Sequence, residues 1–273
     1  MPEIPDSEKK VVRGAVLRRD PARESCFTVV HLHRDLLERA DNSPPAIRER
    51  LHRHMHTELQ TLEIASSSVV DFPDAPRELR MELARQCWDE ARHVNLLYRK
   101  LREKGGRKGE FPVMNFDWGV SMMMKTLPAR LAVQNRALEG GEMDLLRQLM
   151  TAWVELGERE TAELMEVILA DEIQHVRFAN RWLKHFGQKT PRTFLEVIGA
   201  MQYLKKVTEA IAPQPGETNA LEMDLVSYNH METLPSVEDR LLAEFTQAEV
   251  AQLLKESGFG AIAPKPPVPQ SAG

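Results

Sequence analysis

The chain has 273 residues, of which 42% are hydrophobic and 28% charged, and its formal net charge is −5. This composition is typical of a globular protein with a sizeable core, and its mild acidity argues against a broad nucleic-acid surface. No apolar run approaches the ~18 residues of a membrane helix, the start "MPEIPDSEKKVVRG" has no apolar signal segment, and two cysteines make no disulfide framework, so we expect a cytoplasmic protein without a membrane partner.

The first half of the chain predicts a polar extension followed by two long helices. Residues 1–43 form an N-terminal extension that is polar and irregular over residues 1–30, and "VVHLHRDLLERA" is a candidate for a weak helix. A long helix should run from residue 44 to about Val70, because Ser43 can cap it and two prolines suit its first turn. The next helix begins at Pro76 and ends at the glycine pair of "KLREKGG".

The second half predicts further helices separated by glycine and proline. A third helix covers roughly 120–139, and "EGGEMD" should interrupt it before a shorter piece near 143–156. The remaining helices are expected at about 158–186, from Pro191 to about Ile211, and at about 237–256.

These elements predict an all-α fold. Residues 44–190 should form a four-helix bundle made of two similar hairpins. Residues 191–260 are expected to add helices packed on the bundle, and residues 261–273 to form a flexible, proline-rich tail.

Two of the predicted helices carry the same motif. "CWDEARHV" and "LADEIQHV" share Asp-Glu-x-x-His-Val, 82 residues apart. Positions i and i+3 lie on one helix face, so Glu90 can act with His93, and Glu172 with His175. Carboxylate and imidazole are good ligands for first-row transition metals. Both pairs fall in or beside apolar stripes, where a buried carboxylate is costly unless a cation compensates it.

The first long helix should supply a further carboxylate. Glu58 is the polar interruption of its apolar stripe, and it lies as far before Val70 as Glu90 lies after Glu78. An antiparallel hairpin therefore brings Glu58 and Glu90 to one level. Glu63 would lie roughly 7.5 Å further along the axis. We prefer Glu58 and keep Glu63 as the alternative, because helix ends are predicted only to within a few residues.

The third helix offers Glu139 in "RLAVQNRALEGG". Glu139 precedes Glu172 by 33 residues and Glu58 precedes Glu90 by 32, a second sign of a duplicated half. Four glutamates and two histidines match the ligand pattern of ferritin-like di-metal bundles.

Asp89 and Asp171 each lie four residues before the histidine of their own motif. A metal-bound histidine usually donates its other N–H to a carboxylate or carbonyl. We expect each aspartate to accept that hydrogen bond from the histidine of the opposite helix.

On these residues the chain resembles the ferritin-like superfamily of non-haem di-iron proteins. "HTELQTLE", "WDEARH", "RLAVQNRALEGGEMD" and "ILADEIQHVRFANRWL" look like a bacterial ferritin-like family of unknown function, distantly similar to the di-iron hydroxylase of a modified adenosine in tRNA. The resemblance covers about residues 45–190. It implies the ligands Glu58 or Glu63, Glu90, His93, Glu139, Glu172 and His175.

The first functional hypothesis is a di-iron oxygenase or oxidase that uses O2 to hydroxylate, N-oxygenate or desaturate an organic substrate. Its cofactor would be two iron ions, although manganese or a mixed manganese–iron pair suits the same ligands. Its partners would be O2, a small-molecule or modified-nucleoside substrate and a separate electron-donating reductase, and a homodimer is compatible with the sequence. The alternative is a ferroxidase or peroxide-scavenging protein of the ferritin or rubrerythrin type.

A histidine-rich tract, "HRHMH" at 52–56, also suggests metal binding. Such tracts more often form a solvated helix face, and we expect that here.

Overall fold

The computed structural model describes residues 4–36, 42–212 and 234–257. Helices dominate this part of the chain and its strands form only two short pairs, which confirms the predicted all-α fold class. None of the helices in these ranges is both long and apolar enough to cross a membrane.

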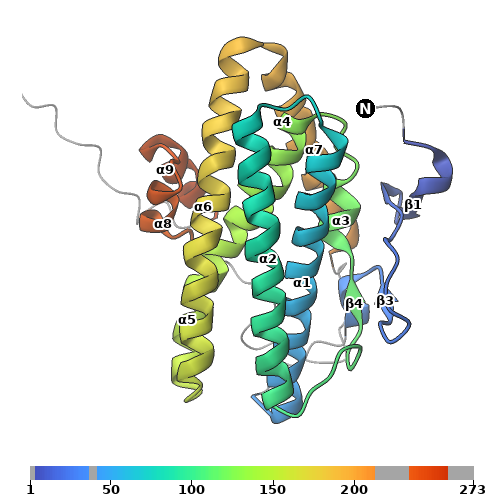
Figure 1. Cartoon of the computed structure of the whole chain (residues 1–273), viewed down its shortest axis with the longest axis vertical. Coiled ribbons are helices and arrows are strands. Elements are labelled where there is room, and N and C mark those ends of the chain that lie inside the picture. Colours follow the sequence, from blue (N-terminus) through green and yellow to red (C-terminus); the bar gives the residue numbers. More distant parts are fainter. Residues whose placement is uncertain (1–3, 37–41, 213–233, 258–273) are drawn as a thin grey trace, which may run out of the picture.

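Two helical hairpins form the bundle (Figure 1). Helices α1 (Pro44–Asp71) and α2 (Arg77–Glu103) make the first hairpin, and α5 (Gly140–Glu155) and α6 (Arg159–Lys189) make the second. The sequence signals act as expected, since prolines open α1 and Gly105, at a φ of 79°, follows the end of α2.

The third rod is continuous where the sequence predicted a break. Helix α4 (Leu127–Leu131) runs into a π-helical segment, η3 (Ala132–Glu139), and η3 runs directly into α5. Gly140 has ordinary helical angles, φ −59° and ψ −39°, so the interruption expected at "EGGEMD" is wrong. Glycine serves close packing here, because a Cβ at this position would lie 2.7 Å from Nη1 of Arg240.

The N-terminal region covers one side of the bundle with short elements. After η1 (Asp6–Glu8), β1 (Lys9–Val12) pairs with β2 (Ala15–Arg18), and β3 (Val29–Val30) pairs in parallel with β4 (Val113–Met114). The weak helix expected in "VVHLHRDLLERA" is wrong for residues 29–36, which form β3 and the 3-10 turn η2 (His33–Leu36). Its last four residues lie outside the described ranges.

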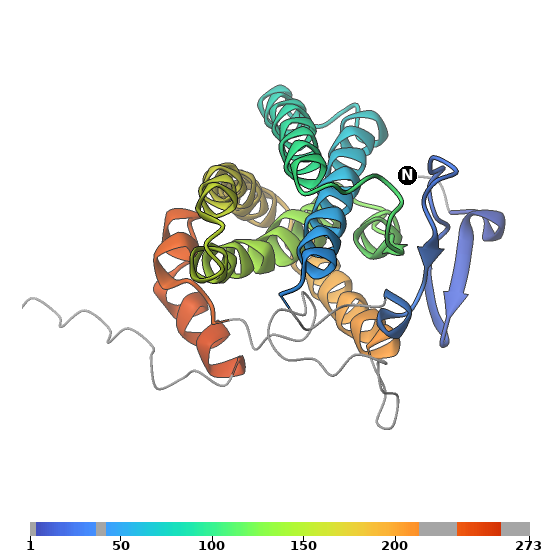
Figure 2. The same cartoon turned by 90° about the horizontal axis from the view of Figure 1, so that it is seen from below.

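The remaining helices pack around the third rod, formed by α4, η3 and α5, and around the fourth rod, α6. α3 (Phe116–Ser121) is a separate short helix, so the third rod starts later than predicted, and α7 (Arg192–Ile211) contacts α4 and η3. The expected last helix is two helices, α8 (Val237–Leu242) and α9 (Gln247–Glu256), because Glu244 has a φ of 64° and Thr246 caps α9. Figure 2 shows α8 and α9 on the opposite side of the bundle from the N-terminal strands. The predicted tail, 261–273, lies outside the described residues.

Candidate metal centre

The two repeated motifs face each other inside the bundle. Helix α2 carries Glu90 and His93, and α6 carries Glu172 and His175, and each of these residues is at most 2% exposed. The i, i+3 spacing puts the carboxylate and imidazole of each motif on the inward face of its helix.

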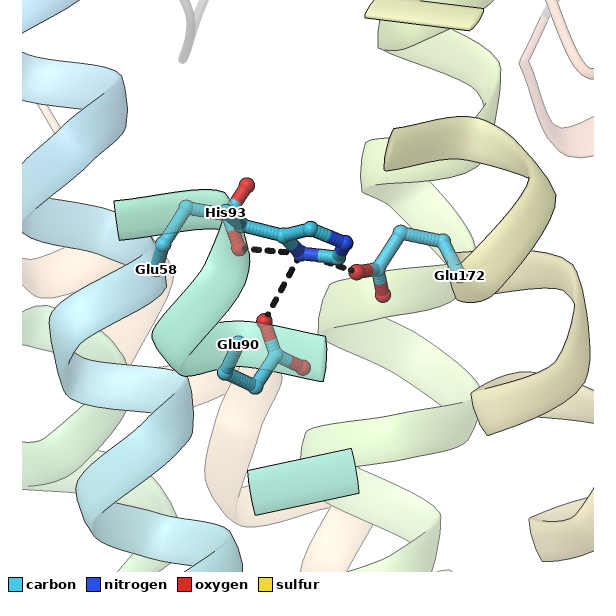
Figure 3. A group of neighbouring side chains, drawn as sticks. All are labelled: Glu58, Glu90, His93 and Glu172. Atoms are coloured by element: carbon cyan, nitrogen blue, oxygen red, sulfur yellow. Dashed lines mark hydrogen bonds and ion pairs between the residues drawn. The ribbon is translucent and has the colours of Figure 1, made fainter. Parts of the chain in front are cut away.

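Three carboxylates converge on the imidazole of α2. Nδ1 of His93 lies 3.4 Å from Oε2 of Glu58, 3.2 Å from Oε2 of Glu90 and 3.5 Å from Oε1 of Glu172. Figure 3 shows these side chains reaching the same nitrogen from α1, α2 and α6. The four residues offer ligand atoms that all lie within 4.8 Å of one another.

A second group lies directly beside the first. Nδ1 of His175 lies 3.2 Å from Oε1 of Glu90 and 3.3 Å from Oε2 of Glu172, and Glu139 from η3 completes a set within 4.8 Å. Glu90 and Glu172 belong to both groups and direct one oxygen to each histidine. Two carboxylates are therefore shared between the two groups, and the buried cluster can hold a metal ion.

The two aspartates lie behind the histidines of the opposite helices. Oδ2 of Asp171 is 3.0 Å from Nε2 of His93, and Oδ2 of Asp89 is 3.4 Å from Nε2 of His175. A hydrogen bond at Nε2 keeps the proton there and leaves Nδ1 facing the carboxylates. Arg85 in turn donates to Asp89, and Arg92 to Asp171.

The cluster carries more negative charge than its histidines offset. Burial, reinforced by Glu90, raises the pKa of Glu172 well above its usual value, and burial raises the pKa of Glu139 to about 8. Burial would lower the pKa of His93 and His175, but the carboxylates of Glu58 and Glu172, respectively, raise both instead. The site therefore favours taking up cations, either protons or metal ions.

Comparison with known families places the chain. Residues 4–220 match the family model described as "Protein of unknown function (DUF455)". The chain belongs to this family. The match includes all six buried glutamates and histidines of the two groups. The curated proteins and the solved structures contain no match to the chain, so the chemistry must be argued from the site itself.

Glu58 and Glu63, the two candidate ligands that the sequence offers on α1, have different surroundings. Glu58 is 1% exposed and lies in the cluster, whereas Glu63 forms an ion pair with Arg23 at 2.6 Å, away from it. The structure thus brings together Glu58, Glu90, His93, Glu139, Glu172 and His175 and leaves Glu63 outside. Their binding of metal stays a prediction.

The histidine tract is buried, so its expected solvated face is wrong. His52, His54 and His56 are at most 2% exposed. The N-terminal region and the loop before β4 cover them: Gly109 donates to Nε2 of His52 at 2.9 Å, and Arg23 to Nε2 of His56 at 3.2 Å. Burial lowers the pKa of His52 to about 4 and that of His56 to about 3, so both are neutral.

Sequence reasoning missed the groups that surround Glu58 and Glu139. Around Glu139 they are amides: Gln86 donates at 2.5 Å, Asn135 at 2.9 Å and Gln134 at 3.4 Å. Around Glu58 they are His54, which contacts Glu58 directly, and Glu142, which contacts His54. The sequence signal for these groups is spacing on a helix. Asn135 and His54 each precede a glutamate of the cluster by four residues, and Glu142 follows Glu139 by three.

Proposed function

We propose that this chain is a ferritin-like di-metal protein that uses two iron ions and O2 to oxidise an organic substrate. The observation that carries the proposal is the pair of shared carboxylates, because Glu90 and Glu172 each direct one oxygen to each histidine Nδ1. A ligand set with two bridging carboxylates holds two ions side by side.

The charge of the site supports metal ions over a closed ion-pair network. Four ionised glutamates and two histidines leave two negative charges even with both imidazoles protonated, so metal ions, or protons on Glu139 and Glu172 with their raised pKa values, must compensate them. Oε1 of Glu172 is buried and makes no hydrogen bond. Two divalent ions would neutralise the four carboxylates with both histidines neutral, so the residues fit a metal pair.

The protein's part would be to hold this geometry. Glu58 and His93 would bind one ion, Glu139 and His175 the other, and Glu90 with Glu172 would bridge them. Asp171 and Asp89 would keep the histidine protons on Nε2, so that Nδ1 stays free to bind. When bound, a carboxylate-rich pair of ferrous ions would supply O2 activation.

A neighbouring cavity favours an enzyme over an iron store. It has a volume of about 270 Å³, lies between α1, α3 and α5, and is lined by residues that include Thr57, Gln60, Asp117 and Glu142. Glu142 lines the cavity and lies 3.2 Å from His54, which in turn lies 2.8 Å from Glu58, so a small molecule in this cavity would lie close to the cluster. Hydroxylation would consume O2, two electrons and two protons and release water, and we expect a separate reductase to donate the electrons.

Metal counting and O2 uptake test this function. The full chain is stripped with a chelator, reloaded anaerobically with iron(II), analysed for metal and then given O2. We expect at least two ions per chain, and O2 uptake that stops after the bound iron is oxidised unless reductant is added. Continued uptake with hundreds of stored ions would instead support the ferroxidase alternative.

The bridging glutamates provide the sharpest variants. Glu90→Ala and Glu172→Ala should each lose at least one ion, because each removes a ligand shared by both positions. Glu63→Gln is the matched control on α1, since its carboxylate pairs with Arg23 outside the cluster. Unchanged metal content in both alanine variants would contradict the proposed function.

A further inference from the structure

A third cluster of ligand atoms borders the pair on the side of Glu58. Nε2 of His54 lies 2.8 Å from Oε1 of Glu58 and 3.2 Å from Oε1 of Glu142. The side chains of these residues are 3%, 1% and 10% exposed, respectively. Their three ligand atoms lie within 4.8 Å of one another, as in the two groups already described.

Glu58 divides its two oxygens between the clusters. Oε2 is the atom that lies 3.4 Å from His93, whereas Oε1 is the atom that lies 2.8 Å from His54. A carboxylate placed in this way can bind one ion through each oxygen. The third cluster therefore does not compete with the first for the same atom.

The separations in this cluster are close to those of a coordination shell and also to those of hydrogen-bonded ion pairs. Ligands bound at ~2.1 Å in tetrahedral or octahedral geometry lie about 3.0 to 3.4 Å apart. The contacts of His54 with the two glutamates are close to that range, as are the contacts of His93 with Glu58 and Glu90.

Glu142 supplies an independent indication of a ligand. Its side chain is nine-tenths buried, and Oε1 faces Nε2 of His54 at 3.2 Å as an ion pair and has no other hydrogen-bond partner. Glu142 also lines the cavity between α1, α3 and α5. An ion held here would have an entry route and room for water ligands on the cavity side.

Among the residues that the structure describes, no such cluster stands at the equivalent place in the other half of the bundle. Asn135 precedes Glu139 by four residues, as His54 precedes Glu58, and its amide donates to Glu139 at 2.9 Å. Gln86 also donates an amide hydrogen to Glu139. An amide N–H group satisfies a carboxylate by hydrogen bonding and does not bind a metal. The carboxylate of Glu139 is therefore surrounded by hydrogen-bond donors, whereas that of Glu58 faces an imidazole.

We propose that His54, Glu58 and Glu142 form a third metal site for a divalent transition-metal ion, beside the pair and open to the cavity. One imidazole and two carboxylates suit Fe²⁺, Mn²⁺ or Zn²⁺ better than the all-oxygen preference of Ca²⁺ or Mg²⁺. This site rests on the proposed function because it shares Glu58 with the pair.

The competing account is a protonated His54 that bridges two glutamates without metal. Both accounts hold the same three side chains together, but they differ in the number of ions bound. Ion counting with substitutions on this cluster alone therefore separates them.

The test is an anaerobic titration of the chelator-stripped full chain with Co²⁺, followed by its visible absorption and by metal analysis after desalting. His54→Asn gives α1 the residue that the other half carries at this place and keeps a donor to Glu58. Glu142→Gln keeps the shape and removes the charge. Glu63→Gln is the control, and circular dichroism checks that each variant is helical.

We expect three ions per chain in the unchanged protein and in Glu63→Gln. His54→Asn and Glu142→Gln should each retain two ions, with the third bound more than about 100-fold more weakly. Two ions in the unchanged protein, or three in both cluster variants, would overturn the third site and leave the proposed pair standing. Fewer than two ions in the unchanged protein would reject both.

Discussion

At the residue scale, the aspartates behind the two histidines orient the imidazoles that we propose as metal ligands. Asp171 accepts from Nε2 of His93 at 3.0 Å and fixes the imidazole orientation. Asp171→Asn replaces a charged acceptor by a neutral amide, and loss of such a partner typically costs about 10–100-fold in metal affinity. Competition with a chelator should show this weakening in Asp171→Asn and unchanged affinity in Asp74→Asn, an exposed control. Equal metal affinities in Asp171→Asn and Asp74→Asn would contradict a positioning role of Asp171.

Single residues also show where sequence reasoning ended. Glu58 and the two Glu-x-x-His pairs could be predicted to cluster because helical periodicity fixes which positions share a face. His54 could not, since it is covered by Glu142 from another helix. A histidine-rich tract has the same local pattern whether or not such a cover exists.

At the element scale, the third rod depends on two adjacent glycines with opposite roles. A Cβ at Gly140 would crowd Arg240, which is held by Asp144 at 2.5 Å, whereas a Cβ at Gly141 would meet nothing within 4 Å. Alanine favours a helix interior over glycine by about 1 kcal/mol. Gly141→Ala should therefore raise the free energy of unfolding by roughly 0.5–1 kcal/mol, while Gly140→Ala should lower it. Urea midpoints measure both, and equal gains would show that Arg240 moves without cost.

The elements that the sequence predicted correctly are those with local signals. Prolines, the glycine after α2 and a 3.6-residue periodicity fix α1, α2 and α6. The glycines of "EGGEMD" wrongly predict a helix break, because a glycine required for close packing looks the same in sequence as a glycine required for a turn. Strands β3 and β4 are two residues each and pair across more than 80 positions, so no periodicity announces them.

At the scale of the whole molecule, the bundle is two similar hairpins around a charged centre. The bundle therefore buries four glutamates against two histidines in one cluster. Burial raises the pKa of Glu139 to about 8 and that of Glu142 to about 7, and carboxylate neighbours raise the pKa of His54, against burial, to about 9. The stability of the metal-free chain should thus depend on pH.

The sign of that dependence is clearest between pH 6.5 and 8. A group whose folded pKa is raised stabilises the fold fully below its unfolded pKa and loses this contribution as pH rises through the folded value. Glu139 and His54 both lose stabilisation in this window. His52 and His56, whose pKa values are lowered, act in the opposite direction only below about pH 6.5, the unfolded histidine pKa.

The melting temperature of the metal-free chain should therefore fall from pH 6.5 to 8. Metal ions replace the protons, and their affinity rises as the ligands deprotonate, so the stabilisation by added metal should grow over the same range. Thermal melts with chelator and with saturating Mn²⁺ at matched pH measure both trends. A metal-free melting temperature that rises with pH, or a metal-induced shift that shrinks, would mean that the buried carboxylates are neutralised by fixed partners rather than by exchangeable cations.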